Sequence, residues 1–152
     1  MSPDKIREAV VAAKVELIED MLAGIATLPL ASEEELTADP RMLAAGESFL
    51  RRALEALLDL GRHLLAKGFG IPAAEYKAIP RELEQVGVLT PDLAARLLEM
   101  AGYRNRLIHM YDEVTPGELY QILTSHLGDV PAVLDALRHW IALYPERGDR
   151  AL

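Results

Sequence analysis

The chain has 152 residues, no cysteine and a formal net charge of −8. We expect one domain over residues 1–152, because this length can bury a core without disulfides, and the missing cysteines exclude thiolate zinc sites. The acidic balance excludes broad, non-specific nucleic-acid binding, which rests on a basic face, but it leaves room for a small, locally basic site. Leu and Ala dominate the apolar residues and aromatic residues make up only 5%, which favours helical packing over a β-sandwich.

The N-terminal segment predicts an amphipathic helix. Ser2-Pro3 is a helix-start signal, and apolar residues then recur at three- and four-residue spacing as far as Leu28, before Pro29. Charges interrupt the segment throughout, so it lacks the apolar stretch of a signal peptide, and no window of the chain reaches the ~18 apolar residues that span a bilayer. We therefore expect a cytoplasmic protein with no membrane association.

A second, longer helix is predicted from about Pro40 to Lys67. Ser32 and Glu35 have capping-box spacing in the polar connector, and Asp39-Pro40 is a further start signal. The apolar residues of the longer helix include Leu43, Leu50, Leu54, Leu57, Leu58, Leu60, Leu64 and Leu65. Because they cover a wide arc, we expect this helix to be central and to contact several others.

Three more helical segments follow a connector rich in glycine and proline. A short helix is predicted over residues 81–87, and Thr90-Pro91 starts a longer one. Thr115-Pro116 starts the last, which should kink or restart near Asp129 because Pro131 lies inside its pattern. No strand-like alternation is found, so we expect an all-α, up-and-down bundle of four to five main helices.

Residues 102–114, GYRNRLIHMYDEV, carry polar side chains where the third long helix should be apolar. The inward stripe of that helix, which includes Leu97 and Ile108, predicts apolar residues at positions 104 and 111, but the sequence has Arg104 and Tyr111. A guanidinium on an inward line is costly unless it is paired. Arg104 is therefore either the buried half of an ion pair or a residue that faces a cleft.

His109 lies five residues beyond Arg104, about 140° further around a regular helix. The two side chains can converge if the helix frays or bends at its end, or across a two-fold axis between two subunits. Arg106 and His109, three residues apart, are the pair that a regular helix places on one face.

Arginine and histidine together suit the cleavage of RNA phosphodiester bonds. Histidine can take the proton of the 2′-hydroxyl near neutral pH, and arginine offers a fixed fork of donors for the charge that develops at the phosphate. This route needs no metal and no cofactor, and no two histidines of the chain have ligand spacing within one helical turn. Two histidines would allow a separate base and acid, and a homodimer would supply them.

The pattern RxxxxHxY, formed by Arg104, His109 and Tyr111, resembles that of HepT-like toxins of the HEPN superfamily. The resemblance extends over roughly residues 40–143 and includes ALEALLDLGRHLLAKGFGIPAAEYKAI and LEQVGVLTPDLAARLLEMAGYRNRLIHMYDEV. It implies a HEPN-like homodimer and a metal-independent endoribonuclease that leaves 2′,3′-cyclic phosphate or 3′-phosphate ends. Such a protein would be the toxin of a type VII-like toxin–antitoxin module, with an MntA-like minimal nucleotidyltransferase as antitoxin.

The resemblance also implies roles for single residues. Arg104 would stabilise the scissile phosphate, and His109 would be general base or acid. Asn105 would be a polar support, and Tyr111 would accept AMP from the antitoxin, which adds bulk and negative charge where the RNA phosphate should lie. The candidate RNA contacts are Arg106, Arg62 and His63.

Two other functions stay open at this point. The acidic charge favours a non-catalytic helical binding subunit that docks a minimal nucleotidyltransferase without cutting RNA. A purely structural dimerisation domain is the third hypothesis, for which Arg104→Ala would abolish folding. Independently of these functions, Arg104, Asn105 and His109 can form a structural polar network.

Overall fold

The helix-start signals of the sequence cap helices in the computed structural model, which describes residues 5–109 and 114–149. The hydroxyl of Ser32 accepts the backbone N–H of Glu35, and the Asp39 carboxylate accepts that of Arg41. In the same way, the hydroxyls of Thr90 and Thr115 accept backbone N–H groups three residues on. Each cap satisfies a donor that the first helical turn leaves without an internal partner.

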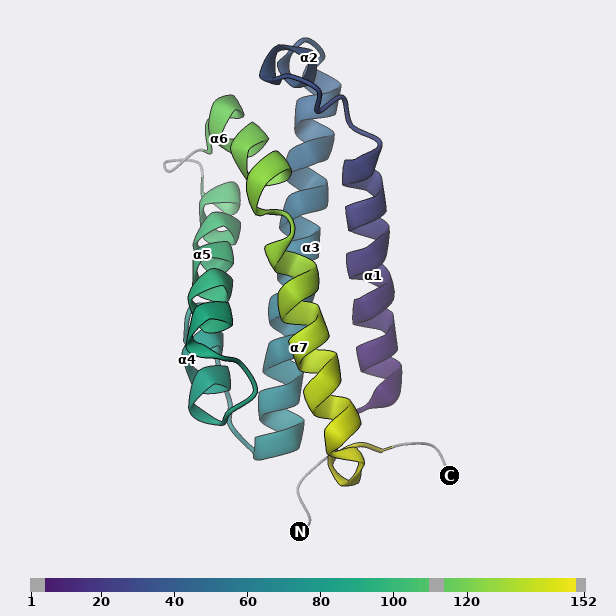
Figure 1. Ribbon diagram of the computed structural model, residues 1–152, viewed down its shortest axis with the longest axis vertical. Coiled ribbons are helices and arrows are strands. Elements are labelled where there is room, and N and C mark those ends of the chain that lie inside the picture. Colours follow the sequence, from purple (N-terminus) through teal and green to yellow (C-terminus); the bar gives the residue numbers. More distant parts are fainter. Residues whose placement is uncertain (1–4, 110–113, 150–152) are drawn as a thin grey trace.

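In the described residues, four long helices form the body of the molecule, and Figure 1 shows their arrangement. They are α1 (Glu8–Ala26), α3 (Pro40–Phe69), α5 (Pro91–Ile108) and α7 (Asp129–Leu143). The shorter elements are α2 (Glu33–Thr37), α4 (Ala78–Gln85), α6 (Pro116–Gln121), the π-helical turn η1 (Ile122–His126) and the 3-10 turn η2 (Pro145–Arg147). The described part of the chain contains helices and no strand, so the predicted all-α bundle is confirmed.

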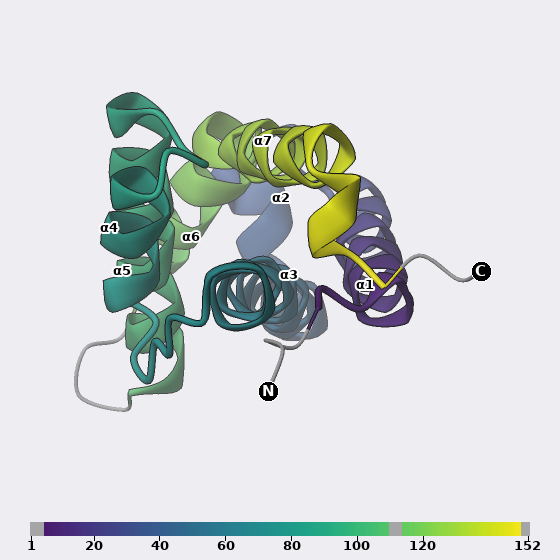
Figure 2. The same ribbon diagram turned by 90° about the horizontal axis from the view of Figure 1, so that it is seen from below.

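The central helix is α3, as the width of its apolar arc predicts. Seen from below, α1, α5 and α7 surround it (Figure 2). The leucines that are at most 1% exposed along α3 are Leu50, Leu54, Leu57, Leu58, Leu60, Leu64 and Leu65. Gly46 lets η1 approach closely, because a Cβ at this position would lie 3.2 Å from the side chain of Leu123.

The first helix begins later than predicted. It starts at Glu8, and Ile6 is extended and pairs with Gly148 near the other end of the chain. The N–H of Ile6 donates to the carbonyl of Arg147, and the N–H of Asp149 donates to the carbonyl of Ile6, both at 2.8 Å. These two bonds satisfy the Ile6 backbone outside a helix. The predicted start signal at residues 2–3 lies outside the described residues.

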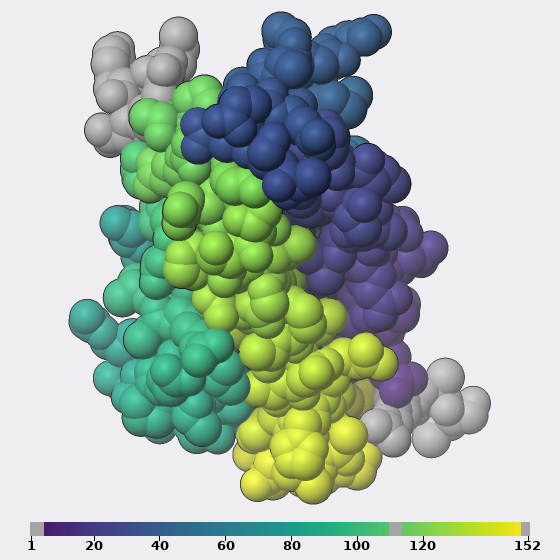
Figure 3. Space-filling model, turned by 45° about the horizontal axis from the view of Figure 1, so that its top comes forward, coloured from purple at the N-terminus to yellow at the C-terminus, as the bar shows by residue number. Residues whose placement is uncertain are grey.

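The last helical region restarts at Asp129, as Pro131 predicts. Proline fits there because the first turn of a helix needs no N–H at that position. On one face of the molecule, α6, η1 and α7 run between α1 and α2 on one side and α4 and α5 on the other (Figure 3). None of the helices in residues 5–109 and 114–149 has the length and apolarity needed to cross a membrane.

The short helix after the connector also starts earlier than predicted, at Ala78 instead of residue 81. Ile79 and Pro80 are buried and draw the start of the helix inward. Ile79 packs over Gly61 of α3, where a Cβ would lie 3.0 Å from its side chain.

Candidate functional site

Arg104 is the half-buried end of an ion pair between α5 and α3. Its Nη2 and Nε lie 2.9 Å and 3.3 Å from Oε2 of Glu55, and its Nη1 donates to Oδ1 of Asn105 at 3.2 Å. The side chains of Arg104 and Glu55 are 20% and 24% exposed. Within the described residues these contacts use three of the five N–H groups of the guanidinium, and one N–H on each terminal nitrogen remains for a ligand.

The guanidinium of Arg104 also lies over the aromatic ring of Tyr76. Tyr76 lies in the connection between α3 and α4, and its ring centroid is 4.6 Å from Cζ of Arg104. Its hydroxyl donates to Asp59 at 2.7 Å. Burial, together with the hydrogen bond to Asp59, raises the pKa of Tyr76 to about 12, so the hydroxyl keeps its proton at neutral pH.

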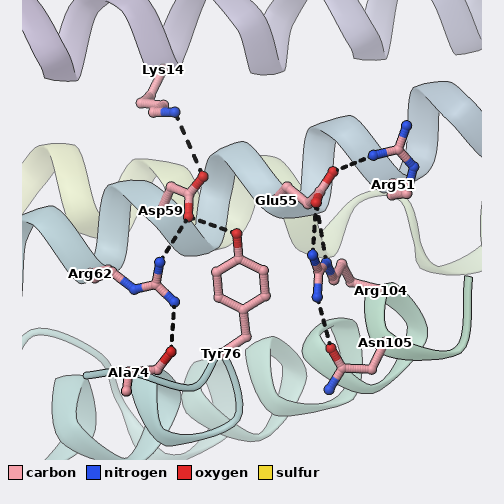
Figure 4. A network of polar contacts seen from close by, with 9 residues as sticks. All are labelled: Lys14, Arg51, Glu55, Asp59, Arg62, Ala74, Tyr76, Arg104 and Asn105. Atoms are coloured by element: carbon pink, nitrogen blue, oxygen red, sulfur yellow. Dashed lines mark hydrogen bonds and ion pairs between the residues drawn. The ribbon is translucent and has the colours of Figure 1, made fainter. Parts of the chain in front are cut away.

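One face of α3 supplies the acidic partners of this cluster (Figure 4). Glu55 and Asp59 are four residues apart, so they lie one turn apart on that face. Glu55 also accepts from Arg51 at 2.7 Å. Asp59 pairs with Arg62 and with Lys14 of α1, each at 3.6 Å. Glu55 and Asp59 therefore form ion pairs with four cationic side chains from three helices.

A cavity of about 420 Å³ opens in front of Arg104. Its lining residues are Arg62, Ala74, Glu75, Tyr76, Lys77, Arg104 and Asn105. Three cations and one carboxylate line it, although the chain as a whole carries a net charge of −8. The arrangement suits an anion of nucleotide size.

His109 ends α5 instead of continuing it. Its φ and ψ are −94° and 123°, and its N–H donates to the carbonyl of Arg106. Its side chain is exposed and lines a second cavity, of about 390 Å³, together with Arg106, Glu47 and Pro116. The expected break in the helix before His109 is therefore present, but in the described chain His109 and Arg104 line different cavities.

Two further candidate residues, Arg62 and Arg106, are bound to other groups of the protein. Arg62 lines the cavity of Arg104, but two of its nitrogens donate to the carbonyls of Ala73 and Ala74. Arg106 forms a bidentate pair with Glu118, at 2.5 and 2.7 Å, which holds the pKa of the Glu118 carboxyl below its usual range.

His63 lies away from the cavity in front of Arg104 and contacts the start of α1. Its Nε2 accepts the backbone N–H of Arg7 at 2.9 Å. Its imidazole thus serves as an acceptor next to the N-terminus of that helix. The candidate RNA contact at His63 stays a prediction without support from this geometry.

Acidification should weaken the fold through His63. Burial lowers its pKa below the ordinary value of 6.5, and the nearby charges of Lys67 and Arg7 add to this. The unfolded chain therefore binds more protons than the folded one just below pH 6.5, so stability present above that pH is lost as the pH falls. The urea midpoint should drop more between about pH 7.5 and about pH 5.5 in the wild-type protein than in His63→Gln, whose amide oxygen can still accept. Equal drops of the urea midpoint in the two proteins would contradict this effect of His63 on stability.

Glu55, Asp59 and Tyr76 belong to this cluster, although no sequence pattern predicted them as site residues. The two acidic residues did leave a signal, because carboxylates four apart interrupt a leucine-rich helix, whereas Tyr76 lies in an irregular connection without periodicity. Tyr111, the predicted AMP acceptor, lies outside the described residues. Among the described residues, no group of three His, Asp or Glu side chains is arranged to hold a metal ion.

Comparison with known proteins identifies the family. The ribonuclease HepT-like family model matches residues 13–137. The tRNA nuclease HepT of Aphanizomenon flos-aquae is 24% identical over 145 residues, which are 95% of this chain and 98% of that protein. The mRNA nuclease HepT of Shewanella oneidensis is 28% identical over 90 residues, 59% of this chain and 67% of that protein.

A solved structure shares the fold. It is the tri-AMPylated HEPN toxin of Shewanella oneidensis in complex with MNT antitoxin, with a TM-score of 0.78 and 20% identity, covering 86% of this chain and 97% of that one. The family match spans most of the chain, from within α1 to within α7. The chain therefore belongs to the ribonuclease HepT-like family.

Proposed function

We propose that this protein is an endoribonuclease that cuts RNA without a metal ion, with Arg104 and His109 as its catalytic residues. The observation that carries the proposal is the half-buried guanidinium of Arg104, which is fixed on three sides and keeps two N–H groups toward a cation-lined cavity. The names of the two nuclease relatives support RNA as the substrate class. We place its action in the cytoplasm, where tRNA and mRNA are found.

The proposed reaction is attack of a 2′-oxygen on the neighbouring phosphorus. A neutral imidazole of His109 takes the 2′-hydroxyl proton as the O–P bond forms. The bond to the 5′-oxygen breaks, and a protonated His109 gives that oxygen a proton, so charge and protons balance. Arg104 stabilises the negative charge that develops on the phosphate oxygens. The products are a 2′,3′-cyclic phosphate, which can open to a 3′-phosphate, and a 5′-hydroxyl.

A homodimer built along α5 would bring together the two residues that one protomer keeps in different cavities. One side of α5 and its end carries residues spaced alternately by three and four positions, namely Ala95, Leu98, Gly102, Asn105 and His109. Leu98 is 46% exposed, and apart from the nearby backbone of α5 and its chain neighbours, no described residue comes within 4 Å of a Cβ built on Gly102. Small and apolar residues on an exposed stripe suit close packing against a second copy of the helix.

Such a dimer would also supply the two proton-transfer groups that the reaction needs. If the two-fold axis runs nearly parallel to α5, the two copies of this helix lie side by side in the same direction. His109 of each protomer would then approach the other, one acting as base and its counterpart as acid. Arg62, Lys77 and Arg104 then concentrate positive charge at the cavity although the net charge of the chain is −8. RNA binding would rest on this local charge and not on a broad basic face.

The partner that we propose is an MntA-like minimal nucleotidyltransferase antitoxin, in a type VII-like module. The neighbouring solved structure holds an AMPylated toxin with its antitoxin, which supports this partner class. We propose Tyr111 as the AMP acceptor. After incubation with the antitoxin and ATP, intact mass should rise by about 329 Da per AMP, and Tyr111→Phe should lack the increment that this site contributes. If the mass of Tyr111→Phe rises as much as that of the wild type, Tyr111 is not the AMP acceptor.

A cleavage assay tests the proposed function. The purified protein should cut total tRNA or an mRNA transcript in the presence of EDTA and leave 2′,3′-cyclic phosphate or 3′-phosphate ends. Absence of cleavage for both RNA classes, or 5′-phosphate products, would contradict the proposal.

One observation favours a second candidate, a non-catalytic subunit that docks a nucleotidyltransferase. All three guanidinium nitrogens of Arg104 already have protein partners, which suits a structural network as well as a catalytic one. This alternative predicts stoichiometric binding to the nucleotidyltransferase and intact RNA in the same assay.

A further inference from the structure

The ring of Tyr76 lies between two guanidinium groups (Figure 4). Its centroid is 4.6 Å from Cζ of Arg104 and 4.8 Å from Cζ of Arg62. Both distances are within the range of a cation–π contact. Among the described residues, Tyr76 supplies the aromatic ring over which the guanidinium of Arg104 lies.

Tyr76 is itself held firmly, although it lies in a connection without regular structure. Its hydroxyl donates to Asp59 of α3 at 2.7 Å. Arg62 donates to the carbonyls of Ala73 and Ala74 at 2.9 and 3.1 Å, and it therefore holds the backbone just before Tyr76 on α3. The ring is thus tied to the central helix and not to α5, which carries Arg104.

The hydrogen bonds of Arg104 and its contact with the Tyr76 ring restrict different movements of the guanidinium. The bonds to Glu55 and Asn105 run from its nitrogen atoms and fix where the edge of the guanidinium lies. Such bonds tolerate some rotation of the guanidinium plane, because hydrogen-bond geometry is broad at carboxylate and amide oxygens. The ring of Tyr76, over which Cζ of Arg104 lies, limits that rotation. It therefore directs the two remaining N–H groups into the cavity.

We infer that Tyr76 is a positioning residue for Arg104, which sets the plane of the guanidinium so that its unused N–H groups meet the scissile phosphate of RNA. The inference rests on the proposed function, because it concerns the same phosphate-binding site. Misplaced donors stabilise developing charge poorly, while the overall charge of the site stays the same. Loss of the ring should therefore lower kcat more than it raises KM.

Steady-state kinetics on a defined RNA tests the role. Tyr76→Leu should lower kcat by roughly ten-fold and change KM by less than about two-fold, as loss of a cation–π contact allows. Tyr76→Phe keeps the ring and should stay within about three-fold of wild type. Tyr144→Leu, at a 42% exposed tyrosine at the end of α7, is the matched control and should behave as wild type. Equal losses in the Leu and Phe variants, or a change confined to KM, would overturn the inference.

An NMR measurement decides the same point without catalysis. The Nε–H proton of Arg104 should be shifted upfield by the ring current of Tyr76, and the shift should disappear in Tyr76→Leu and remain in Tyr76→Phe. A resonance that does not move in Tyr76→Leu would overturn the positioning role. If the wild-type protein leaves RNA intact while the resonance moves as expected, the proposed function fails and the placement of Arg104 by Tyr76 stands.

Discussion

Replacing either catalytic residue should slow RNA cleavage severely without unfolding the protein. Arg104→Lys keeps a positive charge near Glu55 but loses the planar fork, and His109→Ala removes the proton-transfer group. We expect each variant to lose on the order of 10²- to 10³-fold in kcat, in line with the loss of one charge-stabilising or acid–base group. Single-turnover cleavage of a labelled RNA measures the effect.

The matched control for these variants is Arg96→Ala. Arg96 also lies on α5, is 45% exposed and pairs with Asp92 and Asp129, away from the cavity of Arg104. Its loss should leave kcat unchanged. Because His109 is exposed, His109→Ala should keep the wild-type Tm. Wild-type cleavage by the His109→Ala protein would remove the catalytic assignment, and equal losses in all three variants would point to a general effect on α5.

A charge placed on the exposed stripe of α5 should separate the proposed dimer and remove activity with it. Leu98→Glu would bring two like charges together across a two-fold axis at an apolar contact, which is strongly unfavourable. Sedimentation should shift from twice the chain mass to the 16.8 kDa of one chain. Cleavage should fall by at least about 100-fold, because one protomer lacks a second histidine for proton transfer.

Leu143→Glu is the control for Leu98→Glu. Leu143 is 58% exposed at the end of α7, so the same substitution there adds the same charge to a similar surface leucine. It should leave both mass and activity unchanged. A monomeric Leu98→Glu protein that cleaves RNA as the wild type does would show that one protomer suffices, and the two-histidine mechanism would then be wrong.

The features that the sequence predicted well are those with a local cause. The caps at Ser32, Asp39, Thr90 and Thr115 depend on residues within one helical turn, so their pattern was sufficient. The central place of α3 follows from the width of its apolar arc. The restart at Asp129 follows from the chemistry of one proline.

The features that the sequence could not predict depend on distant partners. Ile6 has the spacing of a helical residue, but Gly148, near the other end of the chain, pairs with it instead. The apolar stripe showed that Arg104 needs a partner, yet the partner is Glu55, 49 residues away, and periodicity does not reveal such pairs. Tyr76 meets Arg104 only because Arg62 and Asp59 hold an irregular connection against α3.

If Arg104 and His109 promote attack by the 2′-oxygen of RNA, cleavage requires a 2′-hydroxyl next to the scissile phosphate, and one pair of substrates tests this. After the cut position in an RNA has been mapped, the same RNA is made with a single 2′-deoxy nucleotide on the 5′ side of that position. In the presence of EDTA, the protein should cut the natural RNA to a 2′,3′-cyclic phosphate or 3′-phosphate end and leave the 2′-deoxy RNA intact at that bond. Cleavage of the 2′-deoxy RNA at the same bond and rate would contradict attack by the 2′-oxygen.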